Sequence, residues 1–338
     1  MKPTSIKDIA RRAGVSSSTV SRALQGNPLI SRETAARIRR IAEKAGYLPS
    51  SVGRSLVMRK TLTIGVVVTT IADPVMAEVV SGIEKTADEN GYSVFLAQSY
   101  AEPERETLVV QSFLERRVDG LIVLASRVGA GHRPQVERMR VPLVLVNNQN
   151  PHPYQHSVRI DNVASSREVT EYLIGLGHRR IAYIGDRLGY ESNVERFTGF
   201  RQALKAAGIT LRPEWVVEGD GRIDAGQHAM NQLLDLKKEG PTAVVCYNDL
   251  TAIGALRAAR SRGCPVPAHI SLTGFDDLFI ASDTHPALTT VRQPKHRMGQ
   301  IAAGMLLKIF AGEPGEREIR LPGELIVRES AAPPARRC

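Results

Sequence analysis

The chain has 338 residues, of which 42% are hydrophobic and 24% are charged, and its formal net charge is +10. This length exceeds one typical domain, and the composition is that of an ordinary globular protein rather than a disordered or fibrous one. The longest apolar runs are strand-sized and fall short of the roughly 20 residues that span a bilayer, which argues against a membrane protein.

The positive charge is concentrated at the N-terminus. Residues 1–60 hold 13 of the 45 Lys and Arg but only 3 of the 35 Asp and Glu, so the rest of the chain carries 32 of each. A basic segment joined to a neutral body indicates a polyanionic partner, with nucleic acid favoured over an anionic membrane. The N-terminus has no signal-peptide pattern, and the three cysteines are too few for a disulfide framework, so we expect a reducing cytoplasm.

Three short helices are predicted in the first 46 residues. In the first, apolar residues recur at the i, i+3, i+4, i+7 spacing of one helix face, with Ser5 as the N-cap and Gly14 at the C-terminal turn. The second helix follows Ser16 and the third follows Ser31, and serine is a favoured N-cap residue.

The second helix has a face made only of hydrogen-bonding groups. Ser17, Ser18, Ser21 and Arg22 lie opposite its apolar stripe. A helix, a turn containing glycine and a polar helix are typical of a helix-turn-helix, whose second helix enters the major groove. Serine hydroxyls suit several bases, and arginine pairs with guanine through two hydrogen bonds. The alternative is a three-helix bundle with a solvated serine face, but the coincidence with the net charge favours DNA.

Residues 5–56 resemble the headpiece of the lactose-repressor/galactose-repressor (LacI/GalR) family of bacterial transcription factors. The shared motifs are A-x-x-A-G-V-S, T-V-S-R, Y-x-P and V-x-R-S-L. The resemblance implies that Ser17, Ser18 and Arg22 read bases. It also implies phosphate-contacting or capping roles for a set of hydroxyl residues: Ser5, Ser16, Thr19, Ser21, Ser31 and Thr34.

Residues 50–60 are predicted to form a hinge. A segment this short is not a stable helix in water, so without DNA we expect a flexible linker. The family resemblance implies that it folds into a helix on the operator, pairs with the hinge of a dimer partner and inserts Leu56 into the minor groove, with Val52 on the same helix face.

From residue 62, strand-sized apolar runs alternate with helical stretches. This alternation predicts parallel sheets covered on both faces, so the fold class is α/β. The pattern restarts near residue 160, which indicates two lobes with a ligand cleft at the carboxyl ends of their strands.

Polar residues that follow the apolar runs are the candidates for ligand contact: Thr69, Asp73, Asn147, Asn248, Asp249 and Asp276, joined by Arg196 from a helix. Each Asn or Asp alone is typical of a cap or a turn, but their recurrence at strand ends favours a binding site. Carboxylates and an arginine suit a polyhydroxylated ligand, and a purine is the alternative.

Residues 62–330 resemble the effector domain of the same family, which is itself similar to periplasmic sugar-binding proteins. The matching segments include "RFTGFRQAL", "PTAVVCYNDLTAIGAL" and "ISLTGFDD". The resemblance implies that Arg196, Asn248 and Asp276 bind an effector, and that Thr69, Asp73 and Asn147 line the same cleft.

Two rival classes fit the sequence less well. An enzyme is disfavoured because the chain lacks a G-x-S-x-G elbow, a phosphate-binding loop and an H-E-x-x-H motif. His152 and His156 are four residues apart, but Pro153 opposes the helix that would align them on a metal. We therefore expect no catalytic residue, no metal and no cofactor. A periplasmic solute-binding protein is disfavoured by the helix-turn-helix and by the lack of a signal-peptide pattern at the N-terminus.

The sequence thus predicts a cytoplasmic repressor that binds a pseudo-palindromic double-stranded DNA operator as a homodimer, controlled by a small molecule that is a sugar or a sugar derivative. The expected organisation is a headpiece at 1–49, a hinge at 50–60, and a two-lobed core at 61–330 for effector binding and dimerisation. The lobe boundary is expected near 160, with crossovers near 291 and 322, and a disordered tail is expected at 331–338.

Overall fold

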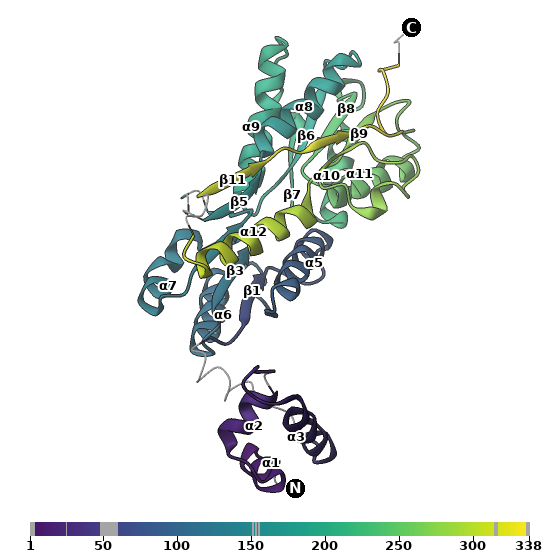
Figure 1. Ribbon diagram of the computed structural model, residues 1–338. Coiled ribbons are helices and arrows are strands. Elements are labelled where there is room, and N and C mark those ends of the chain that lie inside the picture. Colours follow the sequence, from purple (N-terminus) through teal and green to yellow (C-terminus); the bar gives the residue numbers. More distant parts are fainter. Residues whose placement is uncertain are drawn as a thin grey trace. The chain divides into compact units, whose positions relative to one another are not determined.

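The computed structural model describes residues 4–24, 26–47, 60–150, 152, 154, 156–313 and 317–335 (Figure 1). The chain divides into two compact units, Met1–Leu62 and Thr63–Cys338. The hinge candidates Val52 and Leu56 lie outside the described residues. None of the described helices combines the length and apolar character needed to cross a membrane.

The first unit contains three helices around a small core: α1 (Ile6–Ala13), α2 (Ser17–Leu24) and α3 (Arg32–Lys44). Ile9, Val20 and Ile38 bring one side chain from each helix into a cluster with no solvent exposure. The predicted caps are confirmed, because Ser5 and Asp8 form a reciprocal capping box and Gly14 ends α1 at a φ of 64°. These local signals place α2 with its polar face outward.

The second unit is built from two lobes, and the first lobe contains a six-stranded parallel sheet. The strand order is β11-β5-β4-β3-β1-β2. The strand bounds are Thr63–Val68 (β1), Ser93–Gln98 (β2), Gly120–Leu124 (β3), Leu143–Val146 (β4), Ser157–Ile160 (β5) and Glu318–Leu321 (β11). β1, β3 and β4 are buried at every position, as expected of strands covered on both faces.

Two pairs of helices cover the first sheet. α5 (Pro74–Glu89) and α12 (Lys295–Phe310) pack on one face, and α6 (Pro103–Glu115) and α7 (Arg133–Met139) pack on the other. α5 and α12 approach each other closely through Gly82 and Gly299, since a Cβ at either position would overlap backbone of the facing helix. Residues more than 200 positions apart thus form one layer.

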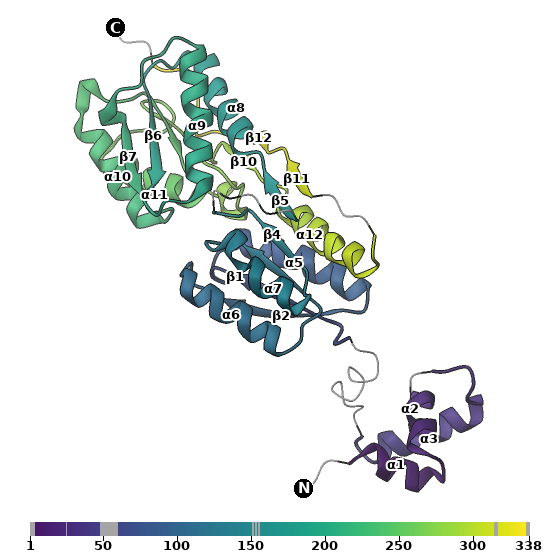
Figure 2. The same cartoon turned by 90° about the vertical axis from the view of Figure 1, so that its left-hand side faces the viewer.

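The second lobe repeats this architecture on a four-stranded parallel sheet of order β7-β6-β8-β9. Its strands are Ile181–Asp186 (β6), Val216–Gly219 (β7), Ala243–Cys246 (β8) and Ser271–Thr273 (β9). Figure 2 shows α8 (Asn162–Gly175) and α9 (Glu191–Ala206) on one face, and α10 (Ile223–Asp235) and α11 (Asp249–Ser261) on the other. The expected α/β class with parallel sheets is confirmed.

The chain passes between the lobes at residue 161, at residues 293–294 and at residues 322–323. Beside the last two passages, β10 (Thr290–Arg292) pairs antiparallel with β12 (Glu324–Ile326), a pair that the sequence pattern did not predict. The expectation of a disordered tail from residue 331 does not hold for Ala331 and Ala332. Ala331 is buried, and Ala332 accepts a hydrogen bond from His178 Nε2 at 2.9 Å.

Candidate functional site

A cleft of about 470 Å³ opens between the carboxyl ends of the strands of the two lobes. The first lobe contributes residues that follow β1, β3 and β4, and the second contributes residues that follow β6, β8 and β9. Six of the seven candidates from the sequence line this one cleft: Thr69, Asp73, Asn147, Arg196, Asn248 and Asp276. The seventh, Asp249, does not line it; it is fully buried and accepts hydrogen bonds from Thr290 Oγ1 and Leu278 N. Its position is the one expected for ligands in open parallel sheets.

Arg196 of α9 lines the cleft and is 6% exposed. Its Nε donates to Asn162 Oδ1 at 2.9 Å, and its Nη1 donates to the Tyr247 carbonyl at 2.6 Å. The guanidinium also lies 3.6 Å from the centre of the Phe275 ring. A buried charge held in this way has a defined orientation before any ligand arrives.

Asp276 faces Arg196, with 3.7 Å between Oδ1 and Nη2. Gln293 Nε2 donates to the same carboxylate oxygen at 2.5 Å. The backbone of Asp276 has a φ of 120°. Burial raises the pKa of Asp276 to about 6, while the charge on Arg196 acts in the opposite direction. The carboxylate and the guanidinium together offer both an acceptor and donors to a ligand hydroxyl.

The other candidates combine cleft positions with structural duties. Asp73 caps α5 by accepting from Val75 N at 2.9 Å, and burial raises the pKa of its carboxyl. Asn248 caps α11 through its oxygen and donates its amide to the Gly221 carbonyl at 2.9 Å. Asn147 has a φ of 47°, and its oxygen accepts from Ile160 N at 3.2 Å. The capping role expected of isolated Asn and Asp residues is therefore real in two of these positions.

Sequence reasoning missed the aromatic and glutamine residues of the cleft. Tyr190 and Tyr247 line it, and the Tyr247 hydroxyl lies 2.8 Å from Ser192 Oγ. Gln149 joins the lobes, because its Oε1 accepts from Ser192 N at 3.0 Å. Gln293 lies at a crossover between the lobes. Its position directly after the segment "PALTTVR" was the only available signal, since tyrosine and glutamine carry no spacing pattern of their own.

The headpiece carries its own candidate site on α2. Ser18 and Arg22 are exposed, and Ser17 and Ser21 are half-buried on the same face. Ser16 Oγ accepts from Thr19 N at 3.1 Å and lies 2.7 Å from Ser18 Oγ, so the hydroxyls at the start of α2 form a connected group.

Three further candidates of the headpiece also act at helix ends. Ser31 Oγ caps α3 and donates to Thr34 Oγ1 at 2.9 Å. Ser5 donates both its hydroxyl and its N–H to the Asp8 carboxylate, at 2.6 and 3.0 Å. The structure therefore shows Ser5 in the capping role of the two that the resemblance implied.

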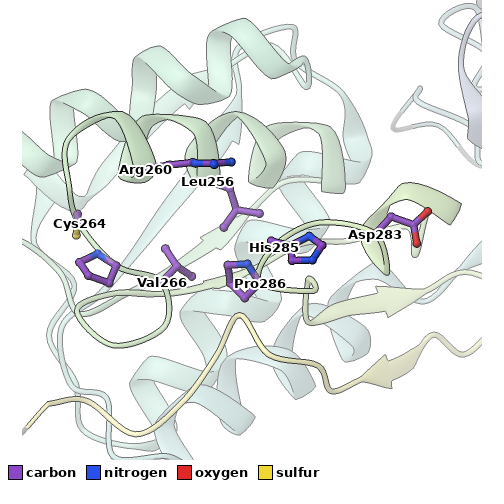
Figure 3. A pocket seen from close by; sticks show the side chains of 8 residues that line it. Leu256, Arg260, Cys264, Val266, Asp283, His285 and Pro286 are labelled. Atoms are coloured by element: carbon purple, nitrogen blue, oxygen red, sulfur yellow. The ribbon is translucent and has the colours of Figure 1, made fainter.

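A second hollow, of about 730 Å³, lies on the second lobe at the end of α11 (Figure 3). Leu256 and Arg260 come from α11, and Asp283, His285 and Pro286 come from the segment after the 3-10 turn Phe279–Ala281. Its charged side chains are exposed, whereas Arg196 and Asp276 of the cleft are buried. Buried, mutually oriented charges are the stronger mark of a ligand site. Within the described part of the chain, no group of three or more metal-ligating side chains gathers.

Comparisons with known proteins match both units. Residues 5–50 match the model for bacterial regulatory proteins of the lacI family, and residues 170–331 match a periplasmic binding protein-like domain. The HTH-type transcriptional repressor CytR of Escherichia coli K12 is 35% identical over 326 residues, which cover 96% of this chain and 95% of that repressor. The chain belongs to the LacI family. The HTH-type transcriptional repressor PurR of Pectobacterium atrosepticum is 36% identical over 330 residues, covering 97% of this chain and 96% of that protein.

Solved LacI-family structures share the fold over nearly the whole chain. The lac repressor dimer bound to operator and the anti-inducer ONPF superimposes with a TM-score of 0.90 at 29% identity, covering 98% of this chain and 100% of that one. The regulator CelR in complex with cellobiose gives a TM-score of 0.73 at 31% identity, covering 97% of this chain and 99% of that one. The family resemblance and the regulatory class expected from the sequence are thereby confirmed, and the relatives named above are transcriptional repressors rather than enzymes.

Proposed function

We propose that this LacI-family regulator represses transcription by binding a pseudo-palindromic operator as a homodimer, and that a small polyhydroxylated molecule in the cleft controls its operator affinity. The buried pair of Arg196 and Asp276 is the observation that carries this proposal, because it offers oriented donors and acceptors between two lobes. The lac repressor dimer on its operator and CelR with cellobiose support the two halves of the proposal. Because the proposed partner is chromosomal DNA, we also propose that the protein is located in the cytoplasm.

In the headpiece, we propose that Ser17, Ser18 and Arg22 read base edges, while Ser5, Ser16, Thr19, Ser21, Ser31 and Thr34 contact phosphates or cap helices. The exposure of Arg22 and the connected hydroxyls at the start of α2 support this division. The hinge roles of Val52 and Leu56 remain predictions from the sequence. The domain bounds, with a headpiece at 1–49, a hinge at 50–60 and an effector core from 61, remain proposals in the same sense.

A sugar is the first candidate for the ligand, and a nucleoside is the second. The carboxylates of Asp73 and Asp276 and the guanidinium of Arg196 suit ring hydroxyls. The observation that favours a nucleoside is the presence of the Tyr190 and Tyr247 rings in the cleft wall, since aromatic faces stack on bases.

A thermal-shift panel of pentoses, hexoses, sugar phosphates and nucleosides on the full chain tests the proposal. A ligand that binds the folded state raises the unfolding temperature by mass action. We expect a shift from one class, and we expect the Arg196→Ala variant to lose it. Retardation of a palindromic DNA fragment, with and without that compound, then shows whether the compound weakens or tightens the complex. A protein that retards no palindromic duplex over random competitor at modest salt would contradict the proposal.

A further inference from the structure

Arg127 connects the two lobes at the mouth of the cleft. It follows β3 in the first lobe, and its Nη1 donates to the Leu188 carbonyl in the second lobe at 3.0 Å. The same guanidinium lies 4.8 Å from the centre of the Tyr190 ring, within the range of a cation–π interaction. Leu188 and Tyr190 both line the cleft, so one side chain of the first lobe holds the rim of the second.

A buried cluster in the first lobe holds the backbone of Arg127. Glu106 of α6 is 1% exposed, and its Oε2 accepts from Arg127 N at 2.9 Å. Its other oxygen accepts from the Ser126 hydroxyl and lies 2.7 Å from His132 Nε2. The ligand site described above uses none of these buried groups. Their arrangement gives the start of the Arg127 side chain a rigid base.

The turn that receives Arg127 is held at both of its ends by backbone hydrogen bonds within the second lobe. At its start, the Arg187 N–H donates to the Gly219 carbonyl at 3.0 Å. At its end, the N–H groups of Asn193 and Val194 donate to the Tyr190 carbonyl at 3.0 and 3.3 Å. Two supported elements, one from each lobe, therefore meet through a single guanidinium.

We propose that Arg127 is a positioning residue that latches the first lobe to the Leu188–Tyr190 turn of the second and so stabilises the closed cleft. The part of this inference that concerns ligand retention rests on the proposed function, but the latch itself is a property of the protein without ligand. When the latch is lost, the hydrogen bond from Ser192 N to Gln149 Oε1 still joins the two lobes across the cleft, among the described residues. The lobes then populate a more open arrangement.

Distances between spin labels on the two lobes of the full-length, ligand-free protein test the latch. One label is attached at Arg138→Cys on α7 and one at Gln202→Cys on α9, both exposed positions, in a chain with Cys264→Ser and Cys338→Ser. Cys246 is buried and is left in place. Mixing with an excess of the same chain without the labelling cysteines keeps the two measured labels within one subunit.

Three variants separate the latch from a general effect of charge. Arg127→Met removes the donor and the cation, and Arg127→Lys keeps the charge but loses the planar stacking group. Arg133→Met is the matched control, because Arg133 is an exposed arginine of the same lobe whose partner is Glu137 of its own helix.

We expect Arg127→Met to lower the ratio of closed to open molecules about tenfold, Arg127→Lys to lower it less, and Arg133→Met to leave it unchanged. An unaltered thermal midpoint shows that the variants fold. Coincident distance distributions for wild type and Arg127→Met, or a wild type with only the open distance, would overturn the latch. Failure to bind any compound or operator would overturn the proposed function and leave this result standing.

Discussion

Arg22 is the residue of the headpiece that we expect to contribute most to base selection. It is exposed on the polar face of α2, and a bidentate arginine–guanine pair discriminates against a wrong base by about 1–3 kcal/mol. Arg22→Ala is therefore expected to lose preference for the operator over random duplex by that amount. Fluorescence anisotropy with competitor DNA at matched salt measures it. Arg201→Ala, at an exposed arginine of α9, is the control, and equal losses in both variants would contradict the assignment.

Asp276 is the residue on which the effector response depends in our proposal. Asp276→Ala removes the carboxylate that faces Arg196 while leaving the headpiece unchanged. We expect the variant to bind operator with wild-type affinity and to ignore the compound found in the thermal-shift panel. Operator titrations with and without that compound measure both quantities. A normal response from the variant would show that the ligand binds elsewhere.

At the scale of single residues, the sequence predicted the place of the cleft but not the role of each residue within it. Every candidate that follows an apolar run except the fully buried Asp249 lines the same cavity, because the carboxyl ends of parallel strands lie at one edge of the sheet. The sequence could not show that the Asn248 side chain caps α11 through its oxygen and donates its NH₂ group to the Gly221 carbonyl. Capping and ligand binding use the same side-chain atoms, so residue type alone does not distinguish them. Gln149 was missed because its partner Ser192 lies in the other lobe, and Tyr247 was missed because its hydroxyl meets Ser192 only once the second lobe has folded.

Helix packing supplies a prediction at the scale of elements. Gly299 of α12 lies so close to α5 that an added Cβ would overlap the Val79 carbonyl, whereas Gly304 of the same helix has open space around it. Gly299→Ala is expected to lower the free energy of unfolding by about 1–3 kcal/mol through overpacking. Gly304→Ala is expected to raise it by up to about 1 kcal/mol, because alanine favours helix.

Urea unfolding of the two alanine variants measures both changes. The pair controls for helix propensity, because both substitutions lie in the interior of α12. Equal effects of the two substitutions would show that the contact between α5 and α12 is not limiting.

The long helices and the strands within apolar runs followed from the sequence, whereas three short strands outside such runs did not. The helical stretches expected between the apolar runs include α5 (Pro74–Glu89) and α11 (Asp249–Ser261), which are long, periodic and preceded by the capping residues Asp73 and Asn248. β7, β10 and β12 have three or four residues each, too few to show a period. β7 pairs with β6 at the edge of the second sheet, whereas β10 and β12 pair beside the crossovers between the lobes, and no sequence pattern marks either pairing.

At the scale of the whole molecule, buried carboxyls make stability depend on pH. Burial raises the pKa of Asp249 to about 8 and that of Asp276 to about 6. Between the ordinary value of 3.8 and these values the folded state binds protons that the unfolded state has released. The contribution of these two carboxyls to the free energy of unfolding therefore falls as pH rises. Below pH 6.5 the lowered pKa of the buried His178 acts in the opposite sense.

Urea unfolding between about pH 6.5 and pH 8 isolates the carboxyl contribution. We expect wild type to lose stability over this range, with a slope of at most about 1.4 kcal/mol per pH unit for one proton. Asp249→Asn, which cannot ionise, is expected to flatten the curve. Parallel curves for the two proteins would show that the Asp249 carboxyl does not titrate in this window.

The strand order of the first lobe also determines when each part of the chain becomes complete during synthesis. α1, α2 and α3 find all their partners within residues 4–47, so this reader is ready to fold soon after it leaves the ribosome. The first sheet, by contrast, waits for β11 at Glu318–Leu321, and α5 stays uncovered until α12 has been made. A nascent subunit therefore acquires its DNA-binding surface early. The first lobe, which forms part of the effector cleft, is completed only when the last residues of the chain have been synthesised.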